Sequence, residues 1–114
     1  MTASDFLKLD EREAAQRLKA SDDLFHILFK RGDFSMELFA PRGSDTQQPH
    51  AQDEIYVISS GRSSFRRADQ VVSVQAGDTL FVPAGVEHRF FDFSDDFRTW
   101  VIFFGEQQAL NPPR

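Results

Sequence analysis

Short strand-like runs, each closed by turn-forming residues, recur along most of the chain and constrain its fold more than any other feature. The runs are rich in aromatic and β-branched residues, and Gly, Asp, Pro or Ser stands between them. No helical pattern separates the runs, so a parallel βαβ arrangement is excluded. We therefore predict an all-β sandwich or closed barrel. The runs cover residues 24–30, 34–40, 54–59, 63–68, 71–75, 79–82, 88–93 and 98–104.

The chain of 114 residues has the size of one domain. At this length folding buries roughly two-thirds of the surface that the unfolded chain exposes, so a core of its own is feasible. We expect a single domain over 1–114, with an N-terminal arm over 1–23, a β-barrel over 24–104 and a tail over 105–114. Within the arm, residues 10–20 are rich in helix formers, and they predict a short helix with Asp10 as its N-cap.

The net charge of -5 argues against nucleic acid or an anionic membrane surface as a partner, because both bind clustered Lys and Arg. The chain has no cysteine, so any metal would be held by nitrogen and oxygen ligands. No apolar stretch approaches the roughly 20 residues that span a bilayer. The first ten residues lack a signal-peptide pattern, and we expect a cytoplasmic protein.

The stretch Gly77–Asp92 combines a buried strand, a turn and a histidine. Residues 79–82 form a short apolar run, Pro83-Ala84-Gly85 predicts a turn, and His88 begins the next extended run. Side chains alternate along a strand, so His88, Phe90 and Asp92 are expected on one face. The turn therefore delivers a histidine to the start of a strand.

A second polar stretch precedes the run 54–59 and reads Gln48-Pro49-His50-Ala51-Gln52-Asp53-Glu54. If the backbone is extended from Gln48 onward, the side chains of alternate residues share one face. That face would carry Gln48, His50, Gln52, Glu54 and Tyr56.

The two stretches resemble the two signature motifs of the cupin superfamily, and the chain is similar to the small single-domain cupins. Gly77, Pro83-Ala84-Gly85 and His88 match the second motif, while His50 and Glu54 match the later part of the first. The resemblance implies a jelly roll in which His50, Glu54 and His88 converge on a divalent metal, Fe, Mn, Ni or Zn. Counting back from Glu54 places Gln48 where the family has its first histidine, and Gln48 is the fourth candidate ligand. An alternative alignment makes His50 the first ligand and Gln52 the second.

Three further side chains are candidates for the walls of a substrate pocket. Tyr56 follows Glu54 on the same face, where its hydroxyl could bond a substrate or act as acid or base, and Phe90 follows His88. Trp100 is the third candidate. The alternative for all three is ordinary core packing.

The resemblance implies an oxygenase similar to the quercetinase-like cupins or, less directly, an isomerase, acting on a small organic substrate. A binding module without turnover is the alternative from another class. In a third possibility, Glu54 and the histidines form a hydrogen-bonded cluster that binds no metal. The resemblance also implies a homodimer.

Overall fold

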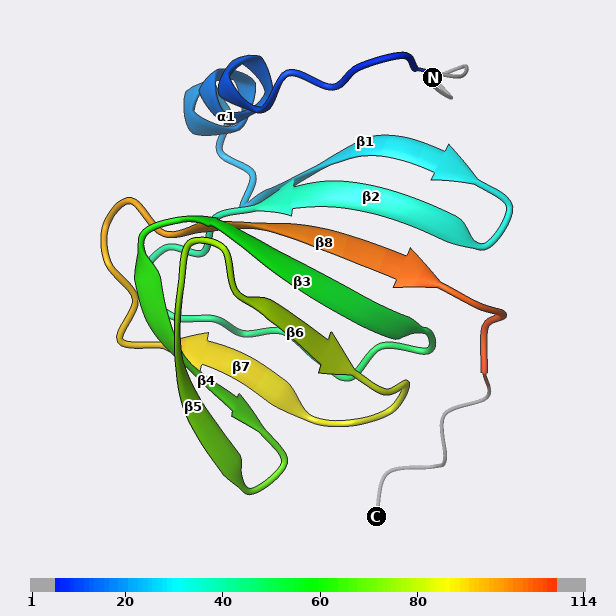
Figure 1. Ribbon diagram of the computed structural model, residues 1–114, viewed down its shortest axis with the longest axis vertical. Helices are drawn as coiled ribbons and strands as arrows, with labels where there is room; N and C mark the ends of the chain where they lie inside the picture. The colour runs from blue at the N-terminus through cyan, green and yellow to red at the C-terminus, as the bar shows by residue number, and fades with distance from the viewer. Residues whose placement is uncertain (1–5, 109–114) are drawn as a thin grey trace.

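The computed structural model describes residues 6–108, and the other residues lie outside the description (Figure 1). Within that range the chain forms one helix and eight strands, as the sequence predicts. Part of the predicted arm and most of the predicted tail fall outside these residues. The elements are α1 (Glu11–Ala20), β1 (Phe25–Arg31), β2 (Phe34–Phe39), β3 (Asp53–Ser60), β4 (Arg62–Arg67), β5 (Gln70–Gln75), β6 (Thr79–Val82), β7 (His88–Phe91) and β8 (Arg98–Phe104).

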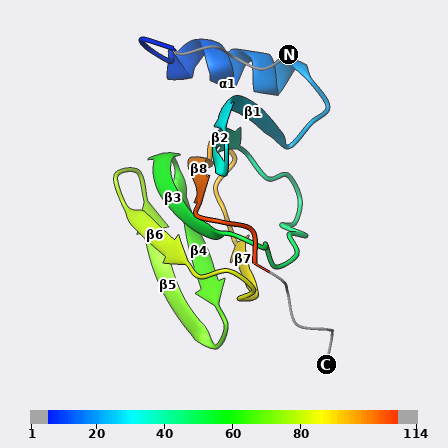
Figure 2. The ribbon, with the colours of Figure 1, turned by 90° about the vertical axis from the view of Figure 1, so that its right-hand side faces the viewer.

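The strands form two antiparallel sheets, which Figures 1 and 2 show from two directions. A five-stranded sheet has the order β1-β2-β8-β3-β6, and a three-stranded sheet has the order β5-β4-β7. Strands far apart in the sequence are neighbours, since β8 lies between β2 and β3, and β7 pairs with β4. This is the all-β, jelly-roll type of sandwich with a short N-terminal helix that was expected.

The main core lies between the two sheets and is largely aromatic. In β3 the alternation of the strand buries Glu54, Tyr56 and Ile58 and leaves the residues between them only partly covered. Tyr56 packs edge-on against Phe90 of the opposite sheet, with ring centroids 4.9 Å apart. The cluster comprises Phe39, Tyr56, Ile58, Phe65, Val74, Val82, Phe90, Phe97 and Val101. Glu54, on the same face of β3 as Tyr56 and Ile58, is therefore held at the edge of this core.

A smaller apolar cluster lies on the outer face of the five-stranded sheet, beneath α1. Asp10 caps this helix, because its Oδ1 accepts a hydrogen bond from the Glu13 backbone N–H at 3.1 Å. The buried side of the helix presents Ala14 and Leu18 to Leu38 and Trp100. The helix therefore covers the sheet rather than an end of the barrel.

Trp100 does not wall the cavity between the sheets, and on this point the prediction needs correction. In β8, Thr99 and Val101 are the buried neighbours, and Val101 belongs to the inner core. Trp100 takes the opposite parity, packs below α1, and donates a hydrogen bond from Nε1 to Glu11 Oε1 at 2.7 Å. Strand alternation divides the side chains into two sets, but it does not say which set faces inward.

Candidate metal centre

The candidate centre joins the two sheets at one end of the inner core. Glu54 is the second residue of β3 in the five-stranded sheet, and His88 is the first residue of β7 in the three-stranded sheet. His50 lies in the loop that leads into β3. Segments separated by more than thirty residues thus bring their polar side chains to the same place.

Two hydrogen bonds fasten the turn before His88 to the segment that bears His50 and begins β3. The Gly85 N–H donates to the His50 carbonyl at 2.8 Å, and the Ala84 N–H donates to Oδ1 of Asp53, also at 2.8 Å. Gly85 has a φ of 80°, a conformation that glycine adopts without a steric cost. Gly85 of the second motif therefore helps to hold the backbone of His50, a candidate ligand of the first motif.

The three side chains expected to converge do so. His88 Nε2 lies 2.8 Å from Glu54 Oε1, and His50 Nε2 lies 3.9 Å from the same oxygen. One potential ligand atom from each residue can be chosen so that all three lie within 4.8 Å of one another. The side chains of Glu54 and His88 are each 1% exposed, whereas that of His50 is 33% exposed and forms the open side of the group.

The hydrogen bonding of the group leaves buried acceptors without partners. His88 Nδ1 lies 2.8 Å from the Val86 carbonyl, which can only accept, so Nδ1 carries a proton. In the neutral ring, Nε2 is then an acceptor that faces the Glu54 carboxylate. Nε2 and both carboxylate oxygens are buried without a directed hydrogen bond to any described residue.

Two acceptors in contact require a positive charge between or upon them. In the metal-free protein, burial lowers the pKa of His88, but contact with Glu54 more than offsets this and leaves the pKa raised. A proton on Nε2 would therefore satisfy the pair. A divalent cation would do the same, and two imidazoles with one carboxylate suit first-row metals. The residues present thus fit the metal that the family resemblance implies.

The side chains of His50 and Tyr56 are in environments that differ from that of His88. Burial lowers the pKa of His50, so its imidazole tends to be neutral, the form that binds metal. Burial and the Glu54 charge raise the pKa of the Tyr56 phenol well above its ordinary value. Tyr56 is therefore a hydrogen-bond donor rather than a base.

Gln47, rather than Gln48, is the amide beside the histidines. Gln47 Oε1 lies 3.3 Å from His50 Nε2 and accepts a hydrogen bond from the Tyr56 hydroxyl at 3.0 Å. Gln47 also donates from Nε2 to Asp45 Oδ2 at 2.8 Å. The side chain of Gln48, the predicted fourth ligand, is exposed, because the chain becomes a strand only at Asp53 and the assumed alternation does not extend back to the loop. Gln52, from the alternative alignment, instead donates hydrogen bonds to the carbonyls of Asp33 and Gly105.

A pocket of about 560 Å³ opens beside His50. Phe103, which pairs with Glu54 across the sheet, packs edge-on against the His50 ring at 4.9 Å. Tyr56 and Phe90, the predicted substrate-binding residues, are buried in the core and are not among the lining residues. The lining residues are Asp22, Asp23, Leu24, Phe25, Glu37, Phe39, Asp45, Thr46, Gln47, His50 and Phe103.

The sequence alone does not identify Phe103, Glu37 and Asp45 as lining residues. Phe103 shares the strand parity of Val101, which would have indicated an inward position once the inner face of β8 was known. Glu37 lies in an otherwise ordinary strand, and Asp45 lies in a polar loop where carboxylates are common. No local pattern distinguishes those two carboxylates from solvated ones.

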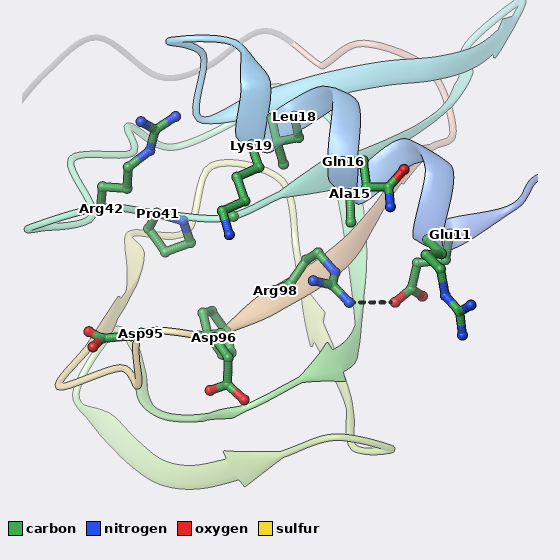
Figure 3. A pocket seen from close by; sticks show the side chains of 13 residues that line it. Glu11, Ala15, Gln16, Leu18, Lys19, Pro41, Arg42, Asp95, Asp96 and Arg98 are labelled. Carbon is green, nitrogen blue, oxygen red and sulfur yellow. Dashed lines mark hydrogen bonds and ion pairs between the residues drawn. The ribbon is translucent and has the colours of Figure 1, made fainter.

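A second and larger pocket, of about 800 Å³, lies beneath α1 (Figure 3). Arg98 Nη2 donates to Glu11 Oε2 at 3.1 Å across one side of it. Its described lining includes no histidine, and it lies on the side of the five-stranded sheet away from His88. This pocket is therefore separate from the candidate metal centre.

Comparison with known proteins agrees with this architecture. A protein of Streptomyces coelicolor, named "Uncharacterized protein SCO3923", is 37% identical over 98 residues, which are 84% of this chain and 91% of the relative. A cupin-2 domain protein of Shewanella frigidimarina superposes with a TM-score of 0.69 at 20% identity, over 88% of this chain and 94% of that one. A cupin 2 conserved barrel protein of Salinispora arenicola gives 0.65 at 20% identity, over 91% of each chain.

Among the described residues, α1 is the one helix, and it is too short and too polar to span a bilayer.

The profile of the family described as "Cupin domain" (Cupin_2) matches residues 35–103, a span that contains both motifs and all three residues of the candidate centre. The chain therefore belongs to the cupin superfamily and contains one of its small domains.

Proposed function

We propose that this cupin binds one divalent first-row metal through His50, Glu54 and His88, and a small organic ligand in the adjacent pocket. The observation that supports the metal most strongly is that, when His88 is neutral, three buried acceptor atoms on Glu54 and His88 have no hydrogen-bond partner. An unpaired buried acceptor costs about 1–3 kcal/mol, and more when it is charged. Coordination would satisfy these atoms together.

The reaction that we propose is oxygenation of a small organic substrate. Two histidines and one carboxylate leave coordination positions open, and this ligand set is typical of non-haem Fe(II) oxygenases. When bound, such a metal would supply Lewis acidity and redox chemistry. The chain itself would fix the His88 ring through the Val86 carbonyl and direct Gln47 towards His50. Phe39 and Phe103 would limit water in the pocket.

A binding module without turnover is the second candidate, and one contact favours it. Gln47, the amide beside His50, is already engaged by Tyr56 and Asp45. An amide oxygen is a weaker donor to these metals than an imidazole, so a three-residue site would bind metal less tightly. Metal-assisted isomerisation is the alternative reaction.

Metal titration of untagged, metal-free protein tests the proposal. We expect one equivalent of Zn²⁺ or Fe²⁺ by calorimetry, with affinity reduced at least about 100-fold in His88→Ala and His50→Ala. His26→Ala is the matched control, because His26 lies on β1 outside the group, and its affinity should be unchanged. Circular dichroism establishes that each variant is folded.

Failure to bind any of Fe²⁺, Mn²⁺, Ni²⁺ or Zn²⁺ would contradict the proposal and favour a hydrogen-bonded cluster formed by Glu54 and the histidines. If metal binds, oxygen uptake with candidate substrates separates a catalyst from a binding module. The homodimer and the cytoplasmic location stay predictions. Light scattering at twice the 13.1 kDa chain mass would support the dimer.

A further inference from the structure

We propose that the pocket beside His50 selects uncharged or cationic ligands over anionic ones, and that Glu37 is the main residue that determines this preference. The ligand would have an apolar body and a hydroxyl or amino group that donates to Glu37. The inference rests on the proposed function, in that it takes this pocket as the ligand site. It adds the charge class of the ligand and a residue that lies outside both motifs.

The charged side chains that line the pocket are all acidic. The four carboxylates are those of Asp22, Asp23, Glu37 and Asp45, while the described lining includes no Lys or Arg. Bound metal would not reverse this balance, because its two positive charges are offset by one on Glu54 and by the four lining carboxylates. A ligand that bears a phosphate or carboxylate would find no cationic side chain in this lining.

The four carboxylates differ in what they contact. Asp22 and Asp23 are exposed at the rim, where solvent and salt screen their charge. Asp45 is buried, and it already accepts hydrogen bonds from the Phe90 backbone N–H and from Gln47. Glu37 is half-buried and makes no hydrogen bond or ion pair with the described residues. Glu37 is therefore the carboxylate that remains available to a ligand.

Strand geometry directs Glu37 towards the pocket. On β2, the next residue, Leu38, packs beneath α1, so Glu37 takes the opposite face. Burial and the charge of Glu54 raise the pKa of Glu37 to about 7, which indicates that both carboxylates belong to one electrostatic environment. Oε1 of Glu54 lies 3.9 Å from Nε2 of His50, which belongs to the lining, and the Glu54 side chain is 1% exposed.

Arg42, which contacts the backbone of the rim residue Asp23, does not compensate this charge. Arg42 donates from Nη2 to the carbonyls of Asp23 and Ser21 at 2.8 and 3.3 Å, and it lines the pocket beneath α1 instead. The remaining wall of the pocket beside His50 is apolar, formed by Leu24, Phe25, Phe39 and Phe103. An apolar body therefore has a surface to pack against, and its donor group has Glu37.

Three probes of nearly equal shape test the inference: phenethylamine, 2-phenylethanol and phenylacetate, which are cationic, neutral and anionic. Each is titrated into ¹⁵N-labelled protein at pH 8, metal-free and Zn²⁺-loaded, with amide shifts of Gln47, His50 and Phe103 as the readout. We expect the amine and the alcohol to bind at least about tenfold more tightly than phenylacetate. In Glu37→Gln, the ratio of amine to phenylacetate affinity should fall several-fold.

Asp69→Asn is the matched control, because it removes the same charge from the exposed turn between β4 and β5. Its affinity ratio should equal that of the wild type. Equal or tighter binding of phenylacetate to the wild type, an unchanged ratio in Glu37→Gln, or no shift of the pocket amides with any probe would each overturn the inference. The Zn²⁺ titration of the same sample reports separately on the proposed metal site, and the charge order stays readable in the metal-free protein.

Discussion

The pocket beneath α1 and the pocket beside His50 differ in how their charges are satisfied. The larger pocket, beneath α1, mixes both signs, and Glu11 there accepts from both Trp100 and Arg98. In that region Arg98 retains one buried nitrogen, Nε, without a hydrogen bond. The smaller pocket is lined by His50, which contacts the pair formed by Glu54 and His88, and that pair has three buried acceptors without partners when His88 is neutral. The number of unsatisfied buried groups therefore distinguishes the candidate metal centre better than pocket volume does.

Outside the candidate metal ligands, the largest expected effect is a loss of stability in the cluster beneath α1, without a change in metal affinity. Leu18→Ala removes a buried side chain from the cluster beneath α1, and it should lower the free energy of unfolding by about 2–4 kcal/mol. Metal affinity should remain that of the wild type, because α1 does not contact the candidate centre. Urea unfolding and metal titration of the same sample measure both quantities.

Arg17→Ala is the control on the exposed side of α1, and it should change stability by less than about 0.5 kcal/mol. Loss of metal binding in folded Leu18→Ala protein would show that the two regions are coupled.

A smaller effect, of opposite sign, is expected in the pocket beside His50. The pKa of Glu37 is about 7 in the folded protein, against an ordinary 4.5, so the wild type is stabilised at low pH and loses that stability as pH rises to about 7. Glu37→Gln does not ionise. In the metal-free protein at pH 8 it should be more stable than the wild type by roughly 2 kcal/mol, and the advantage should disappear near pH 4.

Chemical denaturation across pH 4–8 measures this difference, with Asp69→Asn as the control for a lost surface charge. A stability difference that does not change with pH would contradict the assignment of Glu37 to a desolvated, negatively charged environment.

The smallest effect concerns the ion pair in the larger pocket. Glu11→Gln keeps an acceptor for Trp100 but removes the charge that faces Arg98, and about 1 kcal/mol of stability should be lost. Glu13→Gln is the matched control, because Glu13 pairs with Arg17 on the exposed side of the helix. Tryptophan fluorescence follows the change, since Trp100 is the one tryptophan in the sequence. An equal loss in both variants would show that partial burial adds nothing to the Glu11 pair.

Much of this architecture was predictable because strand alternation and turn chemistry are local. The runs of apolar residues gave the strands, and the two motifs predicted that Glu54, His50 and His88 would meet. Because β3 alternates regularly, the sequence predicts correctly that Glu54 and Tyr56 share one face.

The remaining site residues depended on information that is not local. The prediction of Gln48 as a ligand assumes that strand alternation begins at Gln48, whereas residues 47–52 form a loop and β3 begins at Asp53. Trp100 was assigned to the wrong face of β8 because only tertiary packing decides which face α1 covers. Glu37 enters the pocket through the pairing of β2 with β8, two strands separated by about half the chain.

The buried carboxylate of Asp45 has a consequence for the energetics of ligand capture. It lies midway along the connection from β2 to β3 and accepts the backbone N–H of Phe90 on β7 at 2.8 Å. This hydrogen bond fixes the middle of the connection, so that only a short span of loop separates the fixed point from His50. Fewer backbone conformations remain to be lost when a cation or substrate arrives, so more of the interaction energy is expressed as affinity.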